Sequence, residues 1–344
     1  MKKRWIFLAA AVVLGAVFLW GVLSAGARSQ WFGIEKLRRE AEGAVEEETD
    51  YRYVNEWDPA DSPVRGLDIH WINGRVTVSR WDGETVRITE SCAGPDLSND
   101  DKLKLSSSGG VLEIGWNKRL ISLAVLENRR KDLEILVPNM IRTEPFRLIR
   151  CENTSGDIEL GEGFSAEKLV LASSSGQIRV PQSYQGGSAD ISTTSGEIQL
   201  RNVDLSEELK VRSVEGNIHV EQCACEQAAF KNTSGWVNFS GLVRSAEAAD
   251  GLTVDTVSGK VTLELDEMPA KTQVRTVSGD VVIAAGEKDG YTLTYETVSG
   301  KLVDEAGLSP TGTERKYIAG DGKAELTVAT TDGDLTVAHF QPEG

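Results

Sequence analysis

Apolar and polar residues alternate along most of this chain, in short runs that recur about every 20 residues. Each run centres on a glycine, with apolar residues seven and five positions before it and two and four positions after it. Around Gly259 these positions hold Leu252 and Val254, then Val261 and Leu263. A period of two on both sides of a turn predicts two half-buried β-strands in each copy.

The central glycine belongs to an x-Ser-Gly or x-Asp-Gly step in most copies. It recurs nine times, at Gly156, Gly176, Gly196, Gly216, Gly235, Gly259, Gly279, Gly300 and Gly333. The first seven intervals are 20, 20, 20, 19, 24, 20 and 21 residues, and two weaker copies surround Gly74 and Gly110. We predict a tight corner at each step, because such a corner needs a residue that tolerates positive φ.

The position three residues before the glycine has the inward parity of the apolar positions but is polar. It holds Asn153, Ser173, Thr193, Ser213, Asn232, Thr256, Thr276, Thr297 and Thr330. In stacked copies these side chains would lie about 4.8 Å apart and could form a hydrogen-bonded ladder at a buried corner. Alternatively, each side chain caps its own turn. Both interpretations give these residues a structural role.

A single copy cannot fold alone, because burying four aliphatic side chains does not offset the entropy lost in ordering 20 residues. Stacked copies share strand pairing and burial. We therefore predict an all-β protein, a β-solenoid with two strands per rung, in preference to an antiparallel meander or sandwich. A parallel coil explains why every copy repeats the same polar corner. Atypical copies, such as the one with Trp71 at the polar position, are expected at the ends.

The N-terminal segment has a different character. Trp5 to Leu23 is free of charge and would span about 28 Å as a helix, close to the thickness of the hydrocarbon core. We predict one transmembrane helix, an uncleaved signal-anchor. The alternative is a signal peptide cleaved after Ala25-Gly26-Ala27. The predicted domains are an anchor (1–27), a charged juxtamembrane helix and linker (28–63), and a β-repeat domain (64–340).

The basic cluster at residues 2–4 favours a cytoplasmic N-terminus, which places the β-repeat domain outside the cytoplasm in a single-pass cell-membrane protein. Basic residues also follow the apolar run, between Arg28 and Arg39. They keep open the alternative of an intracellular scaffold tethered to the inner face of the membrane.

Charge and motifs narrow the range of functions. The chain has 53 acidic and 37 basic residues and a formal net charge of −16, which argues against nucleic acid as a partner. Cys223 and Cys225 lack the further ligands of a zinc site. The three histidines have no partner at the spacing of a metal or nucleophile site, and the Asp-Gly pairs at 321–322 and 332–333 lack calcium-repeat spacing. We predict no cofactor, no metal and no catalytic residue.

One enzymatic alternative follows from solenoid geometry. Residues just after the glycines would form an outward column, in which Asp157 and Glu197 lie two rungs apart, roughly 9–10 Å. That separation approaches the carboxylate pair of an inverting glycosidase, and Trp236 could stack on a sugar. The alternative function is therefore a carbohydrate-active solenoid enzyme that acts on an envelope polysaccharide.

The T-x-S-G unit followed by alternating apolar residues, the strand LEILVP and the closing GDGKAELTVATTDGDLTV together resemble a bacterial family, domain of unknown function 4097 (DUF4097). The resemblance covers roughly residues 64–340. Its members are called adhesins or β-strand-repeat proteins, and some are similar to proteins encoded near envelope-stress systems. The resemblance implies a β-solenoid behind a membrane anchor. Our leading expectation is an adhesin-like binding or structural protein of the envelope, with a cell-wall glycan or an envelope protein as partner.

Overall fold

The computed structural model describes residues 50–340, apart from 94–96, 98, 100, 117–129, 142–144, 246–250, 287–288 and 314. The chain divides into two units, residues 1–49 and 50–344. The predicted transmembrane segment and most of the juxtamembrane segment therefore lie outside the described residues. Within those residues, no helix is long and apolar enough to cross a membrane. The term β unit is used below for the described part of the second unit.

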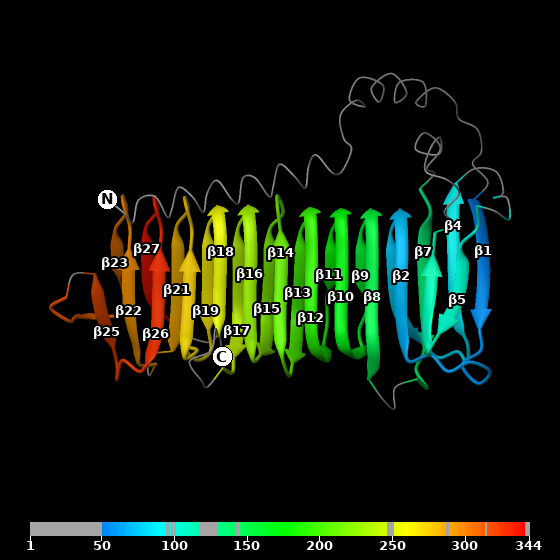
Figure 1. The fold of residues 1–344 in the computed structure, drawn as a ribbon, viewed down its shortest axis with the longest axis horizontal. Coiled ribbons are helices and arrows are strands. Elements are labelled where there is room, and N and C mark those ends of the chain that lie inside the picture. Colours follow the sequence, from blue (N-terminus) through cyan, green and yellow to red (C-terminus); the bar gives the residue numbers. More distant parts are fainter. Residues whose placement is uncertain are drawn as a thin grey trace, which may run out of the picture. The chain divides into compact units, whose positions relative to one another are not determined.

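The β unit is all-β, a single long mixed sheet of 27 strands (Figure 1). Parallel strands form two long series, here called face A and face B, that meet at the glycine corners. Face A contains, in spatial order, β6 (Val111–Gly115), β2 (Gly66–Asn73), β8 (Phe146–Ser155), β10 (Ser165–Ser175), β12 (Tyr184–Ser195), β14 (Glu208–Ser213), β16 (Gln227–Ser234), β18 (Leu252–Ser258), β20 (Lys271–Arg275), β26 (Ala324–Ala329) and β22 (Tyr291–Glu296).

Face B runs alongside in the same order of rungs. It contains β7 (Asp132–Pro138), β3 (Val76–Trp81), β9 (Ile158–Leu160), β11 (Ile178–Val180), β13 (Ile198–Leu205), β15 (Ile218–Cys225), β17 (Val237–Val243), β19 (Val261–Leu265), β21 (Val281–Gly286), β27 (Leu335–Phe340) and β23 (Leu302–Asp304). Solenoid-like stacking of the repeats is thus observed, with one face-A strand and one face-B strand in each rung.

Antiparallel strands extend both ends of the stack, which makes the sheet mixed. At one end β4 (Val86–Ala93) pairs with β7, β1 (Asp50–Trp57) pairs with β4, and β5 (Lys104–Ser108) pairs with β6. At the other end β25 (Lys316–Ala319) pairs with β22, and β24 (Ser309–Pro310) pairs with β25. Strand β1 places the start of the β unit at residue 50, earlier than the predicted boundary at 64, because its side chains alternate between half-buried and exposed on the edge of face B.

The core is a set of aliphatic columns, because equivalent residues of successive rungs are direct neighbours in the ladder. Val211 pairs in register with Ile191 on one side and Phe230 on the other, and Val254 follows Phe230. Val211, Phe230 and Val254 are fully buried. Burial of every second residue on both faces stabilises the stack through the hydrophobic effect.

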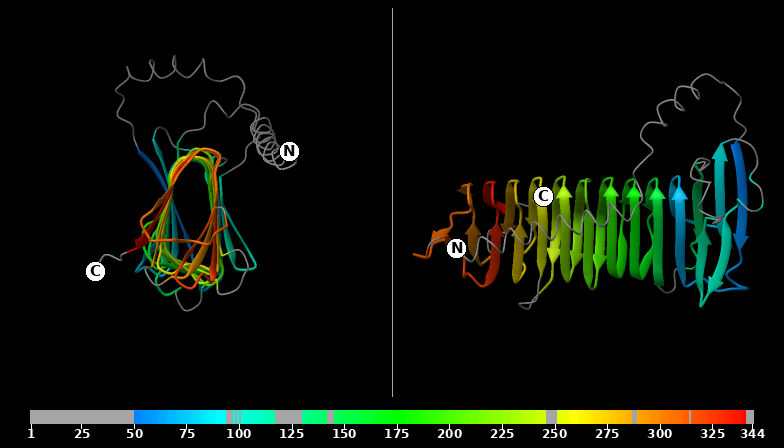
Figure 2. Two further views of the ribbon diagram at one scale, coloured as in Figure 1. Left: turned by 90° about the vertical axis from the view of Figure 1, so that its left-hand side faces the viewer. Right: turned by 45° about the horizontal axis from the view of Figure 1, so that its top comes forward.

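The central rungs have a third, short side that the two-strand prediction did not include (Figure 2, left). Strands β13 and β15 bend at Asn202 and Gln222, whose φ angles are 55° and 52°. After the bend they continue as short segments that stack on one another in parallel, and Val203 pairs with Cys223. This side closes the wide end of the cross-section.

The rungs at both ends are not stacked in chain order. Strand β2 lies between β6 and β8, so the first repeat is covered by a rung from later in the chain. Strand β26 lies between β20 and β22, so the last repeat is inside the stack, where its red colour interrupts the orange strands in Figure 1. Neither the first nor the last rung can separate without breaking pairing on two sides, and we infer that this order protects the ends from fraying.

Candidate functional site

The predicted glycines form one continuous column along a corner of the stack. A Cβ added to Gly196 would lie 2.0 Å from the carbonyl oxygen of Gly176, and one added to Gly333 would lie 2.2 Å from that of Gly279. Real Cβ atoms do not approach oxygen so closely. The glycines are needed because the corners of adjacent rungs pack backbone on backbone, in addition to the positive φ of 147° at Gly196.

The polar residues of the predicted corner are buried, except for half-buried Thr297, and most of those with printed bonds reach backbone carbonyls of the glycine column. Asn153 donates to the Gly74 oxygen (2.8 Å), Ser173 to the Gly156 oxygen (3.3 Å) and Asn232 to the Gly216 oxygen (3.1 Å). Ser213 instead accepts from the amide of Gly216 in its own turn (2.9 Å). The corner is therefore a ladder from side chain to backbone between rungs, with occasional caps of a rung's own turn.

The outward column after the glycines also serves the stack. The Asp157 carboxylate accepts a hydrogen bond from the amide of Gln177 (2.9 Å), and Asn217 accepts one from the amide of Trp236 (3.2 Å). Asp157 and Glu197 occupy the same column two rungs apart, as the glycosidase alternative requires. The bond from Asp157 to the next rung gives that carboxylate a structural role.

The cysteines and histidines are dispersed. Cys223 and Cys225 are buried on β15, and the neighbouring thiol together with burial raises the pKa of Cys223, which keeps it protonated. His219 lies 2.6 Å from Glu221 on the outside of face B. Among the described residues, no group of three or more His, Cys, Asp or Glu is placed to hold a metal ion.

A groove on the outside of face A is the strongest candidate for a ligand site. It has a volume of about 1040 Å³ and lies near the N-terminal end of the β unit, over β5, β6, β2, β8, β10 and β12. Short side chains of β10 and β12, including Ala172, Ser174 and Ser192, form part of its lining. Longer polar residues from β2, β6 and β8 line the rest, so the groove is a hollow in an otherwise covered sheet face.

Its charged residues meet around His70 of β2. His70 Nε2 lies 3.1 Å from an oxygen of Asp68 on the same strand, and Nδ1 lies 3.4 Å from an oxygen of Glu152 on β8. Arg150 Nη1 lies 3.6 Å from Asp68. Ser106 donates a 2.8 Å hydrogen bond to Glu113 on the neighbouring strands. The groove thus offers carboxylates, a hydroxyl and an imidazole within a few ångströms of one another.

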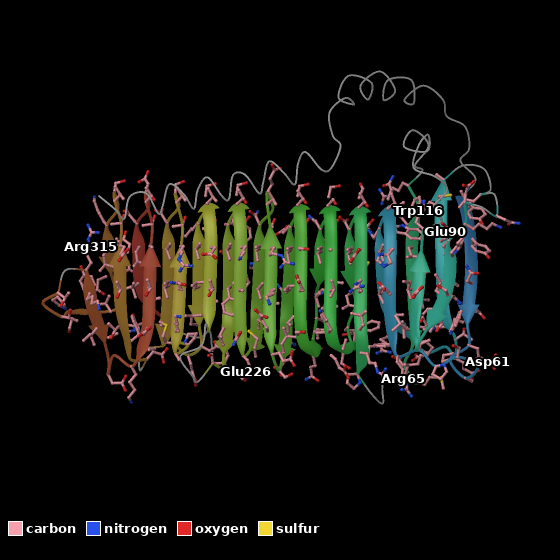
Figure 3. The ribbon with its side chains drawn as sticks, viewed as in Figure 1. Asp61, Arg65, Glu90, Trp116, Glu226 and Arg315 are labelled. Atoms are coloured by element: carbon pink, nitrogen blue, oxygen red, sulfur yellow. The ribbon has the colours of Figure 1, made fainter. Side chains whose placement is uncertain are left out.

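Trp116 forms one wall of the groove, and buried charges fix its position (Figure 3). Its amide donates to the carbonyl of His70 (3.0 Å), and its ring packs edge-on against Trp71, with centroids 4.8 Å apart. The ammonium group of Lys131 lies 3.8 Å from the Trp116 ring centroid. That ammonium is itself paired with Glu90 at 2.5 Å, and both side chains are almost fully buried. The ring is therefore preorganised by a cation–π contact.

The sequence gave only a partial signal for this groove. The i, i+2 pair of Asp68 and His70 on one strand is visible in the sequence, as is their outward parity. Glu152 and Glu113 become their neighbours only because β2 inserts between β8 and β6, which sequential stacking of the repeats does not predict. A search by local spacing therefore found no partner for His70.

A comparison with protein families matches residues 66–338 to the family described as Toastrack DUF4097. The chain belongs to this family. The match covers nearly the whole β unit, and the toastrack domain thus includes both non-sequential ends of the stack. The family resemblance predicted from the T-x-S-G repeat is confirmed.

Solved structures also resemble the toastrack domain. One is a candidate adhesin from Bacteroides fragilis, with 10% identity, a TM-score of 0.42, and coverage of 84% of this chain and 97% of that chain. Another is a candidate cell adhesion protein from Clostridium sporogenes, with 11% identity, a TM-score of 0.27, and coverage of 85% and 100%. No curated protein matches the chain in sequence.

Proposed function

We propose that this toastrack domain is a non-enzymatic, adhesin-like binding rod, displayed outside the cytoplasm and tethered to the cell membrane by residues 5–23. The apolar length of that segment and the basic cluster before it support the tether and its orientation. The candidate adhesins among the solved structures supply an analogy for the role.

The groove on face A supports a neutral cell-wall glycan as the ligand. Sugars are recognised by an aromatic ring that stacks on their apolar face and by polar groups that bond their hydroxyls. Trp116 lies at the wall of the groove, with Asp68, Glu152 and Ser106 also lining it. The mix of carboxylates with Lys104 and His70, on a chain of net charge −16, disfavours a polyanion. The position of Trp116 beside these carboxylates is the observation on which the proposal depends.

Binding to cell walls tests the ligand. The full chain should co-sediment with purified wall glycan stripped of anionic polymers. Trp116→Ala should weaken that binding at least about tenfold, since an aromatic anchor is lost. Because Trp116 also contacts Lys131, Glu152→Gln provides an isosteric second variant that should weaken binding several-fold.

Asp255→Asn is the matched control for Glu152→Gln. Asp255 occupies the same outward column of face A, four rungs further along. Its substitution should leave wall binding unchanged. Equal binding by wild type, Trp116→Ala and Glu152→Gln would remove the groove as the glycan site.

Protease treatment of intact protoplasts tests the orientation. The domain outside the cytoplasm should be digested, while a cytoplasmic marker protein stays intact. Complete protection of the β unit in intact protoplasts, followed by digestion after lysis, would instead favour the intracellular scaffold.

A further inference from the structure

Strand β1 ends the sheet of face B with an exposed edge. It pairs antiparallel with β4 over all eight of its residues, and within the described part of the chain it has no strand on its other side. At the opposite end of the stack, the last strands are short and include Pro310, features that block further pairing. An eight-residue edge without such protection is a site for the addition of another strand.

The sequence of β1 is self-complementary. We propose that β1 pairs antiparallel with β1 of a second copy of this chain, in the register that places Val54 opposite Val54. A two-fold axis perpendicular to the sheet relates the copies, so residues whose numbers add to 108 are opposite one another. Arg52 then faces Glu56 of the second copy, and this pair occurs twice.

Neighbouring registers do not fit. Opposite residues in a sheet share a face, so the sum of the two numbers must be even. A sum of 106 sets Asp50 against Glu56, and a sum of 104 sets Arg52 against itself. A sum of 110 places Val54 opposite Glu56. Among these registers, only the sum of 108 pairs opposite charges.

Exposure and polar pairing support this register. The Arg52 and Glu56 side chains are 66% and 50% exposed, and Val54 is 46% exposed. Glu56 already lies 3.0 Å from Arg87 of β4 and would gain a second cation in Arg52 of the other copy. On the opposite side of the strand, the buried Asn55 Nδ2 has no hydrogen-bond partner. The register places the phenol of Tyr53 from the second copy opposite it.

Such a dimer would join the two β units at their N-terminal ends and continue face B from one into the other. Each copy contributes one groove on face A. A dimer would therefore hold two grooves in fixed relation, which multiplies a weak contact with a repetitive ligand.

Disulfide trapping tests the register directly. The four native cysteines are buried, so Val54→Cys adds an accessible thiol to the full chain. Opposite residues of an antiparallel pair lie about 4.5–5.5 Å apart between Cα atoms, within disulfide range. Mild oxidation should convert most of this variant to a covalent dimer. Val298→Cys, at a valine that is 83% exposed on a corner, is the collision control and should stay largely monomeric.

Charge reversal tests the energetics. Arg52→Glu turns both Arg52–Glu56 pairs into repulsive ones and should raise the dimer dissociation constant roughly tenfold in sedimentation measurements on the full chain. Arg275→Glu, at an exposed ion pair with Asp255, should leave it unchanged. A wild-type chain that stays monomeric, trapping of Val54→Cys no faster than of Val298→Cys, or no effect of Arg52→Glu would each overturn the proposal.

Discussion

Replacing Gly196 with alanine is expected to lower the free energy of unfolding by about 3 kcal/mol or more. The new methyl carbon would lie 2.0 Å from the carbonyl oxygen of Gly176. Relief requires the two rungs to separate at the corner, which stretches the 3.0 Å bond from the amide of Gly176 to the oxygen of Ser195. Chemical denaturation followed by circular dichroism measures the loss.

Gly307→Ala separates the two causes of this loss. Gly307 also has positive φ, at 70°, but no atom lies within 4 Å of its added Cβ. Its substitution should therefore cost only the conformational strain, about 1–2 kcal/mol. If Gly196→Ala costs no more than Gly307→Ala, the corners of the stack are not as tightly packed as the structure shows.

Replacing Glu90 with glutamine is expected to destabilise the β unit by about 3–5 kcal/mol, because it leaves a buried ammonium without its counter-charge. Glu90 is fully buried and Lys131 is 3% exposed. Glu90 also accepts the amide of Leu103 (3.1 Å), and Lys131 donates to the carbonyl of Asp101 (2.8 Å). Thermal unfolding of the full chain and of the variant gives the difference.

Two comparisons make this result specific. Asp190→Asn breaks a 2.6 Å ion pair with Arg212 on the exposed side of face A, and should cost at most about 1 kcal/mol. Adding Lys131→Met to Glu90→Gln removes the unpaired charge and should recover much of the stability. A loss for Glu90→Gln as small as that for Asp190→Asn would show that the pair is not isolated from water.

The buried pair also connects stability to the proposed binding site. Lys131 lies against the ring of Trp116, which forms a wall of the groove. Disturbing Glu90 should therefore shift the aromatic surface offered to a glycan, even under conditions where the β unit stays folded. A repeating rod thus acquires a distinct site at the end where its repeats become irregular.

The local sequence determined most of the architecture. Alternation on both sides of each glycine specified strands, corners and the buried face, because the side-chain period of a strand is two and inward positions must be apolar. Glycine at the corners and the small polar residue three positions earlier followed from the same periodicity. The family followed from the same unit. These features arise from contacts between neighbouring copies of one motif, so a single copy already carries the information.

The tertiary structure decided what depends on the order of the rungs. Sequence similarity between copies cannot specify which copy stacks on which, since every rung presents nearly the same edge to its neighbours. Long-range pairing inserts β2 between β6 and β8 and β26 between β20 and β22. That insertion brings Glu152 to His70, and the approach of β6 and β7 brings Trp116 to Lys131. The groove exists because residues distant in sequence meet at an irregular end, whereas the rod exists because residues 20 positions apart are alike.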